Sequence, residues 1–173
     1  VTINGNVTVN GNAKLLICDG ATLTINGKIT VNTNATLDLY AQAGEAGKLN
    51  VFGTQNRGAV IYGAFRVHGG EISIFGKEYL KYSDAQMEAF REDDPYFENV
   101  KLYETAVEIG RYGAGEDNLS ANGAYHDNAV LLIYRGNVKL TGVRLNDNSE
   151  LRSYSGTITV GALEQYGDEA RLI

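Results

Sequence analysis

The sequence contains a single cysteine, Cys18, so no disulfide can form within the chain. Cys18 follows Leu15, Leu16 and Ile17, and in this apolar setting we expect a small buried side chain rather than a reactive thiol. Proline is almost absent, with Pro95 alone, and tryptophan is missing altogether. The chain therefore has neither covalent cross-links nor many rigid turns, and its fold must come from regular pairing and packing.

Two further absences limit the function. No apolar run approaches the ~20 residues that a membrane-spanning helix needs, so we expect no such span. No basic stripe is present either, which argues against nucleic-acid binding. The net charge of −6 is unevenly distributed, because residues 1–70 carry five basic and three acidic side chains whereas residues 71–173 carry ten and eighteen.

Glycine and asparagine are abundant, and they punctuate a short repeat over residues 1–39. Apolar residues alternate with Thr or Asp, a pattern typical of half-buried strands. The apolar positions are Val1 and Ile3, Val7 and Val9, Leu23 and Ile25, Ile29 and Val31, and Leu37 and Leu39. Asn-Gly follows or separates these runs at residues 4–5, 10–11 and 26–27, where residues that tolerate positive φ mark sharp corners.

Asn-Gly between alternating runs is also the strongest short signal for a β-hairpin. An antiparallel meander is therefore one interpretation. Its strands would be about three or four residues long, which is at the short limit for sheets. A solenoid in which each short strand pairs with its counterpart one coil further on buries these residues better, and repetition at a short period is typical of that architecture.

We therefore predict one all-β domain over residues 1–173, a right-handed single-stranded parallel β-helix of about six coils built from about seventeen strands. Two segments interrupt the rhythm. Residues 79–99 lack alternation, and Ser83 with Gln86 forms a capping-box signature, which predicts a short helix near 83–92 that ends before Pro95. Residues 110–128 form a long Gly-rich polar loop, a kind of segment that often carries function.

Both ends of the chain lie in the middle of the apolar pattern, and neither resembles the polar cap that a solenoid needs. We accordingly expect a fragment of a longer chain or a processed protein.

The stretch GATLTINGKITVNTNATLDLYAQAGEAGKLNVFG, residues 20–53, is similar to β-solenoid repeat segments of large secreted or cell-surface bacterial proteins of adhesin-like type. The resemblance covers the first third of the chain well and the strands after Ala129 more loosely. It implies a right-handed parallel β-helix, extracellular or cell-surface display in bacteria, and an adhesin-like or carbohydrate-associated role.

The tyrosines are the candidate ligand-binding residues, because exposed aromatic rings stack on sugars and anchor protein contacts. Those in the two irregular segments are Tyr79, Tyr82, Tyr96, Tyr112 and Tyr125. If the predicted helix lies across a face of the solenoid, these tyrosines and neighbouring acids would line a groove. Ordinary edge packing of the rings is the alternative interpretation.

A catalytic role is the runner-up. Paired carboxylates hydrolyse glycosides when they lie about 5–10 Å apart, and Glu92, Asp93 and Asp94 are the densest acidic cluster. A solvated helix end ahead of Pro95 explains the same cluster without catalysis. Glu104 and Glu108 could likewise face outward on strands, although isolated acids on a strand surface usually serve solvation.

No strong metal motif is present. Residues 113–119 match most of one G-x-G-x-D-x-U unit, which makes Asp117 a weak Ca²⁺ candidate, but no adjacent copy supplies the remaining ligands. With only His68 and His126, the sequence also lacks a zinc pattern. We expect no cofactor.

The sequence thus favours a non-enzymatic, secreted or surface β-helix module that displays or binds, with a glycan or a surface protein as partner. The alternatives are a polysaccharide-active lyase or glycosidase on a β-helix, and a purely structural spacer.

Overall fold

The computed structural model describes residues 1–54, 57–76, 106–110, 129–146, 148–165 and 170–173. Within these ranges the chain forms sixteen strands and no helix, which confirms the prediction of an all-β fold. None of these residues belongs to a helix that is long and apolar enough to cross a bilayer. The helix predicted near 83–92 and nearly all of the loop predicted at 110–128 lie outside the described residues.

The strands form one ten-stranded and one six-stranded sheet, and every pairing between described strands is parallel. The pairings form three stacks of parallel strands, which we call ladders. Each ladder has six members, and the two longest strands contribute one half to one ladder and the other half to another. The first ladder contains β1 (Thr2–Asn4), β4 (Thr22–Asn26), β7 (Lys48–Phe52), the second halves of β9 (Ala64–Phe75) and β11 (Ala129–Leu140), and β14 (Thr157–Val160).

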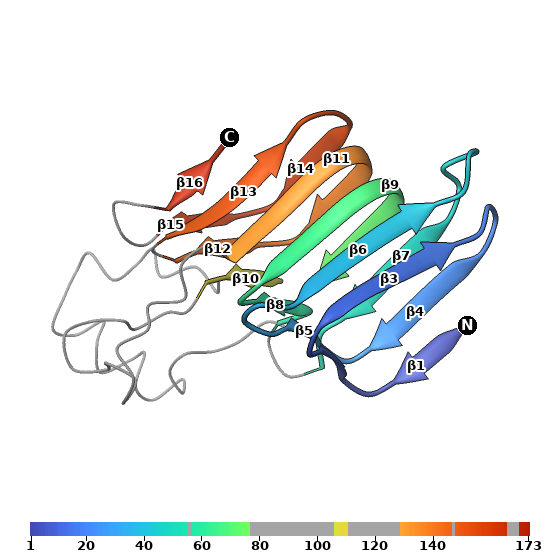
Figure 1. The fold of residues 1–173 in the computed structure, drawn as a ribbon, viewed down its shortest axis with the longest axis horizontal. Coiled ribbons are helices and arrows are strands. Elements are labelled where there is room, and N and C mark those ends of the chain that lie inside the picture. Colours follow the sequence, from blue (N-terminus) through green and yellow to red (C-terminus); the bar gives the residue numbers. More distant parts are fainter. Residues whose placement is uncertain (55–56, 77–105, 111–128, 147, 166–169) are drawn as a thin grey trace, which may run out of the picture.

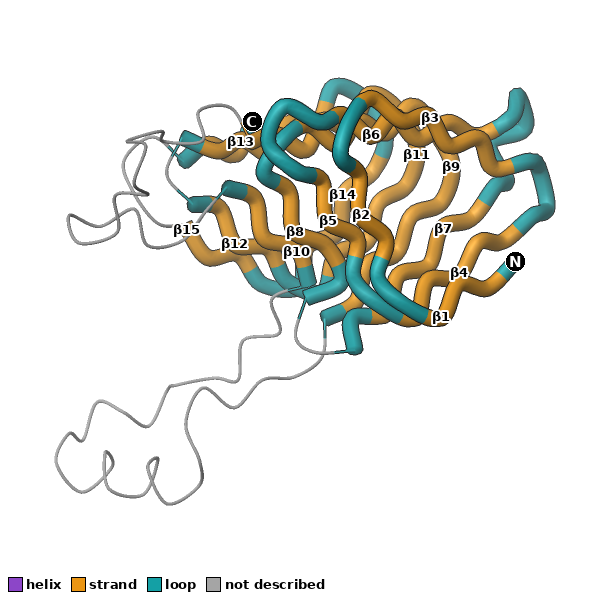
Figure 2. The backbone as a smooth tube through the Cα atoms, turned by 60° about the horizontal axis from the view of Figure 1, so that its bottom comes forward, coloured by secondary structure: helices purple, strands orange, loops and turns teal. Residues whose placement is uncertain are grey.

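The other two ladders follow the same scheme. The second ladder is the six-stranded sheet, with β2 (Val7–Val9), β5 (Ile29–Val31), β8 (Ala59–Ile61), β10 (Val107–Ile109), β12 (Val143–Leu145) and β15 (Leu163–Gln165). The third ladder contains β3 (Asn12–Ile17), β6 (Thr36–Ala41), the first halves of β9 and β11, β13 (Ser149–Ser153) and β16 (Arg171–Leu172). Following the chain, the strands visit the first, second and third ladders in that order, six times over (Figure 1 and Figure 2).

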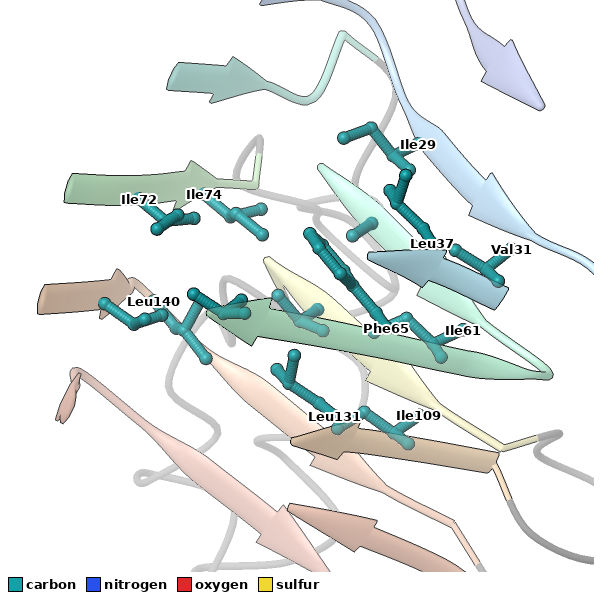
Figure 3. Packing of buried hydrophobic residues seen from close by; sticks show 14 of the residues in the cluster. Ile29, Val31, Leu37, Ile61, Phe65, Ile72, Ile74, Ile109, Leu131 and Leu140 are labelled. Carbon is teal, nitrogen blue, oxygen red and sulfur yellow. The ribbon is translucent and has the colours of Figure 1, made fainter. Parts of the chain in front are cut away.

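Alternation along each strand decides which side chains are buried. In β5, Ile29 and Val31 are buried and Thr30 between them is partly exposed. Residues from all three ladders contribute to a single apolar cluster, and Figure 3 shows the side chains of Ile61, Phe65 and Leu131 among its members. The predicted inward positions Ile25, Ile29, Val31, Leu37 and Leu39 are confirmed as buried, and Leu23 is partly buried against the same cluster.

Successive strands meet at corners. At two of these corners, asparagines at equivalent positions, at the ends of neighbouring strands, bond to each other. Asn26 Nδ2 donates to Asn4 Oδ1 at 2.8 Å, and Asn32 Nδ2 donates to Asn10 Oδ1 at 2.6 Å. Stacked asparagines that bond to each other in this way stabilise in-register parallel strands. The Asn-Gly pairs therefore do mark strand ends as predicted, although Gly5 is the only glycine of the three with a positive φ, at 144°.

Glycines form the corner between the third and first ladders. Gly136 and Gly156 have φ values of 102° and 99°. A Cβ on Gly136 would lie 2.6 Å from Gly70 O, and one on Gly156 would lie 2.1 Å from Gly136 O. Only glycine fits this corner, because both the backbone angle and the close approach of the next strand exclude a side chain.

The two longest strands, β9 and β11, run through their glycine corners without a break. One sequence expectation needs correction here. Cys18 is exposed rather than buried, because β3 ends at the inward-facing Ile17 and Cys18 lies beyond it in the turn.

The core predicts a test of packing. Phe65 is fully buried, so Phe65→Ala should lower the free energy of unfolding by about 3–5 kcal/mol. Lys139→Ala, at an exposed position of the same sheet, should change it by less than about 0.5 kcal/mol. Urea unfolding followed by circular dichroism measures both, and equal effects would contradict the assigned core.

The glycine corner predicts a contrast between two Gly→Ala variants. Gly136→Ala forces a side chain into positive φ and should destabilise the fold by about 1–3 kcal/mol or more. Gly11 has open space around its Cα and no positive φ, so Gly11→Ala should be neutral or stabilise by up to about 1 kcal/mol. Thermal unfolding of the two variants would disprove this corner geometry if Gly136→Ala were the more stable.

Candidate functional site

Of the candidate residues chosen from the sequence, Glu108 lies among the described residues, where it is buried rather than solvated, and the others, Glu104 included, lie outside them. Tyr79, Tyr82, Tyr96, Glu92, Asp93 and Asp94 fall in 77–105, and Tyr112, Tyr125 and Asp117 fall in 111–128. They remain predictions, and the site that follows is built from other residues.

Four aromatic side chains form a row on the outer face of the third ladder. Tyr40 stacks on His68 with ring centroids 4.4 Å apart, His68 stacks on Tyr134 at 4.9 Å, and Tyr134 stacks on Tyr154 at 5.0 Å. The planes of neighbouring rings differ by 8° at most. We call these four residues the aromatic row.

The backbone register explains the row. Val67 pairs with Leu39 in β6 and with Ile133 in β11, and Ile133 pairs with Ser153 in β13. The residues that follow these positions, Tyr40 and His68 on one side and Tyr134 and Tyr154 on the other, are therefore brought close together. Between β9 and β11 the register shifts after Ile133, so that His68 pairs with Arg135 in the backbone while the Tyr134 ring still stacks on His68. The ring spacing is close to the roughly 4.8 Å spacing of adjacent strands. Because the inner rings cover each other's faces, the row offers ring edges and polar tips to a ligand rather than open faces.

Charged side chains accompany the row on the same ladder, and each acid has a basic partner. Asp38 Oδ1 lies 2.9 Å from His68 Nε2 and 3.9 Å from Arg66 Nη1. Since a carboxylate only accepts hydrogen bonds, His68 Nε2 carries the proton in this contact. This contact fixes the orientation of the imidazole between the two tyrosines.

A second pairing lies at the other end of the row. Arg152 Nε is 2.6 Å from Glu150 Oε1, and the Arg152 guanidinium carbon is 5.8 Å from the centroid of the Tyr154 ring. The Tyr154 hydroxyl, with Glu150 in support, raises the pKa of Arg152 above its ordinary value. Arg152, which is charged at any ordinary pH, thus contacts both Glu150 and Tyr154 at the exposed end of the row.

A shallow polar hollow of about 210 Å³ adjoins the row at the glycine corner. Most of its lining comes from the residues that follow Tyr134 and Tyr154 in the chain. The lining residues are Glu45, Gly70, Arg135, Gly136, Asn137, Ser155 and Gly156. Glu45 and Arg135 form an ion pair across it, so a carboxylate, a guanidinium, an amide and a hydroxyl surround one small space whose floor is glycine.

The charges that accompany the row are balanced, and two further basic residues, Lys14 and Arg171, lie on the same ladder in register with Asp38 and Glu150. Three carboxylates on this face are each paired with an arginine, in the pairs Asp38–Arg66, Glu45–Arg135 and Glu150–Arg152. A balanced set of charges of this kind does not attract a polyanion or a polycation over a distance. It suits an uncharged ligand that both donates and accepts hydrogen bonds.

A different group of charges lies on the outer side of the second ladder. Glu108 is buried although it alternates with the core residues Val107 and Ile109. Its Oε2 lies 2.6 Å from Arg57 Nη1, and its Oε1 accepts a hydrogen bond from Asn146 Nδ2 at 3.1 Å. Asn146 Oδ1 has no hydrogen-bond partner in the part of the chain that the structure describes.

This second group does not favour acid–base catalysis. Arg144 pairs with Glu108 in the register and forms an ion pair with Glu164 at 2.7 Å. Glu108 and Glu164 thus lie two strands apart, roughly 9–10 Å, near the separation of about 6.5–9.5 Å found in inverting glycosidases. Each carboxylate is engaged in an ion pair with an arginine, however, and Glu108 is buried besides.

Sequence reasoning missed the aromatic row because the spacing between its members is irregular. Tyr40 and His68 are 28 positions apart, whereas His68 and Tyr134 are separated by 66 because residues 77–105 and 111–128 intervene. Only the pairing of distant strands brings His68 to the tyrosines. Among the described residues, no group of three or more His, Cys, Asp or Glu side chains could hold a metal ion.

The row predicts an energetic coupling between its members. In a double-mutant cycle, Tyr134→Ala and Tyr154→Ala should couple by about 0.5–1.5 kcal/mol in the free energy of unfolding, the contribution of a stacked aromatic pair beyond its area burial. Tyr154→Ala combined with Phe52→Ala, whose ring stacks on Phe75 in the first ladder instead, should be additive within about 0.5 kcal/mol. Additive effects for Tyr134 and Tyr154 would contradict the stacking.

Comparison with models of protein families, with curated proteins and with solved structures gives no significant match.

Proposed function

We propose that the three ladders are the sides of a right-handed parallel β-helix of six coils that belongs to a secreted or surface-attached bacterial protein. The parallel pairing throughout the described strands and the fixed order in which the chain visits the ladders support the β-helix. The resemblance of residues 20–53 to repeat segments of such bacterial proteins supports the location.

The proposed activity is non-enzymatic binding or display, with an uncharged glycan as ligand. The observation that carries it is the aromatic row beside the polar hollow. The tyrosine hydroxyls along the row, together with the Asn137 amide and the Ser155 hydroxyl, provide donors and acceptors that match sugar hydroxyls. The balanced charge favours neutral over acidic sugars.

The direction of the row suggests how the ligand lies. The four rings follow one another across strands, so the row is perpendicular to the strands and parallel to the direction in which the ladder grows. A linear chain of several sugars lying along this direction would meet one ring edge after another, and a single sugar would meet one or two. Affinity should accordingly rise with chain length.

The enzymatic alternative keeps its candidates, Glu92, Asp93 and Asp94, but no observation on the described residues favours it. Glu108 and Glu164, whose strand spacing puts them near the separation found in hydrolases, are both paired with arginines. A structural spacer needs no ligand at all, and it becomes the conclusion if binding is absent.

Tyr→Phe variants test the binding face without disturbing the stack. The triple variant Tyr40→Phe, Tyr134→Phe and Tyr154→Phe removes three hydroxyls and should weaken binding to a neutral linear glycan by about tenfold or more. Tyr62→Phe, which removes a hydroxyl outside the row, is the matched control and should leave affinity unchanged.

The measurement is a screen of the full chain on a glycan array, followed by calorimetry on the best neutral oligosaccharide and its shorter homologues. Absence of any glycan signal would favour the spacer, and unchanged affinity of the triple variant would place the binding elsewhere. A preference for acidic glycans would also contradict the proposal.

A further inference from the structure

The Asn-Gly pairs carry a chemical consequence that does not depend on the binding function. In such a pair the backbone nitrogen of glycine can attack the asparagine side chain, because glycine has no Cβ to hinder the approach. We propose that Asn10 is a site of spontaneous deamidation, and that the fold protects the equivalent residues Asn4 and Asn26.

Asn4 and Asn10 form a matched pair within one molecule. Both lie in the first passage of the chain through the three ladders, and both are exposed. The Oδ1 of each accepts a hydrogen bond from an asparagine in the second passage. These bonds, from Asn26 and Asn32, polarise the side-chain carbonyl and make its carbon more open to attack. Both following glycines, Gly5 and Gly11, have open space around the Cα.

The two residues differ in the state of the attacking nitrogen. Gly5 N–H donates to Asn26 O at 3.0 Å, and Gly27 N–H donates to Phe52 O at 2.9 Å. Among the described residues, Gly11 N–H has no such backbone partner. The nitrogen after Asn10 is therefore free to lose its proton and move toward the side chain, whereas the nitrogens after Asn4 and Asn26 must first leave a hydrogen bond.

Packing protects Asn26 further. A Cβ on Gly27 would lie 2.2 Å from Gly5 O, so the backbone here is enclosed by the neighbouring strand and cannot rotate freely. The expected order of reactivity is Asn10, then Asn4, then Asn26. The pair Asn122-Gly123 lies outside the described residues and is not part of this comparison.

The reaction balances with water as the co-reactant. The Gly11 nitrogen, after giving its proton to base, bonds to Asn10 Cγ; the bond from Cγ to Nδ2 breaks, and ammonia leaves. Water then opens the resulting succinimide. Attack at Cγ restores the ordinary peptide bond and leaves an aspartate at this position, and attack at the main-chain carbonyl gives isoaspartate with the chain running through the side chain.

The two products affect the fold differently. The aspartate product keeps the acceptor that Asn32 Nδ2 uses, and the hydrogen bond becomes charge-assisted. Isoaspartate adds an atom to the main chain next to Gly11, whose carbonyl accepts from Thr36 N at 3.2 Å where the β3–β6 pairing begins. The aspartate form should remain folded with one more negative charge at the corner between the second and third ladders.

Peptide mapping by mass spectrometry tests the proposal. The folded full chain is incubated at mildly alkaline pH, and conversion at positions 4, 10 and 26 is followed over time. Asn10 should convert about two- to tenfold faster than Asn4, as expected if one hydrogen bond must break before reaction. Asn10 that converts no faster than Asn4 or Asn26 would overturn the proposal.

Two controls assign the difference to the fold. Gly11→Ala should slow conversion at Asn10 at least several-fold and leave Asn4 unchanged; this site accepts a Cβ without steric conflict. In strong denaturant, the three wild-type sites should react at similar rates. A preference for Asn10 that persists in the unfolded chain would show that local sequence, not the fold, sets the rate, and would also overturn the proposal.

Discussion

In-register parallel hydrogen bonding between strands is the constraint on which the rest of the structure depends. Each strand is three to six residues long in most of the chain, too short to be stable as part of an isolated hairpin. Pairing with the equivalent strand in the next passage of the chain satisfies the backbone groups of each strand and places its apolar residues over those of its neighbour. Side chains at equivalent positions therefore form rows with the strand spacing, both inside and outside.

This repetition explains the order on the surface as well as that in the core. Inside, Leu39, Val67 and Ile133 lie in register and form part of the apolar cluster. Outside, the residue after each of them, Tyr40, His68 and Tyr134, stacks on the next at nearly the same spacing. The aromatic row and the asparagine pairs at the corners thus both come from the stacking of parallel strands, although in the row the register shifts between β9 and β11.

The sequence was sufficient for the strands and their inward faces, because alternation and corner residues are local signals. The parallel sense also followed from it, since strands as short as Val7–Val9 bury too little as hairpins. The site did not follow from sequence. Tyr40 and Tyr134 are 94 positions apart, and no local pattern connects them. Exposed Cys18 shows the same limit on a smaller scale, because an apolar run predicts burial only as far as the strand continues.

The central claim is that the strand register brings residues 40, 68, 134 and 154 into one row on the third ladder. Proton–proton nuclear Overhauser effects in the full chain measure this directly. The account predicts contacts from the His68 ring to the rings of both Tyr40 and Tyr134, and from Tyr134 to Tyr154. Contacts of His68 with neither tyrosine, in a chain that is folded by the same spectra, would contradict it.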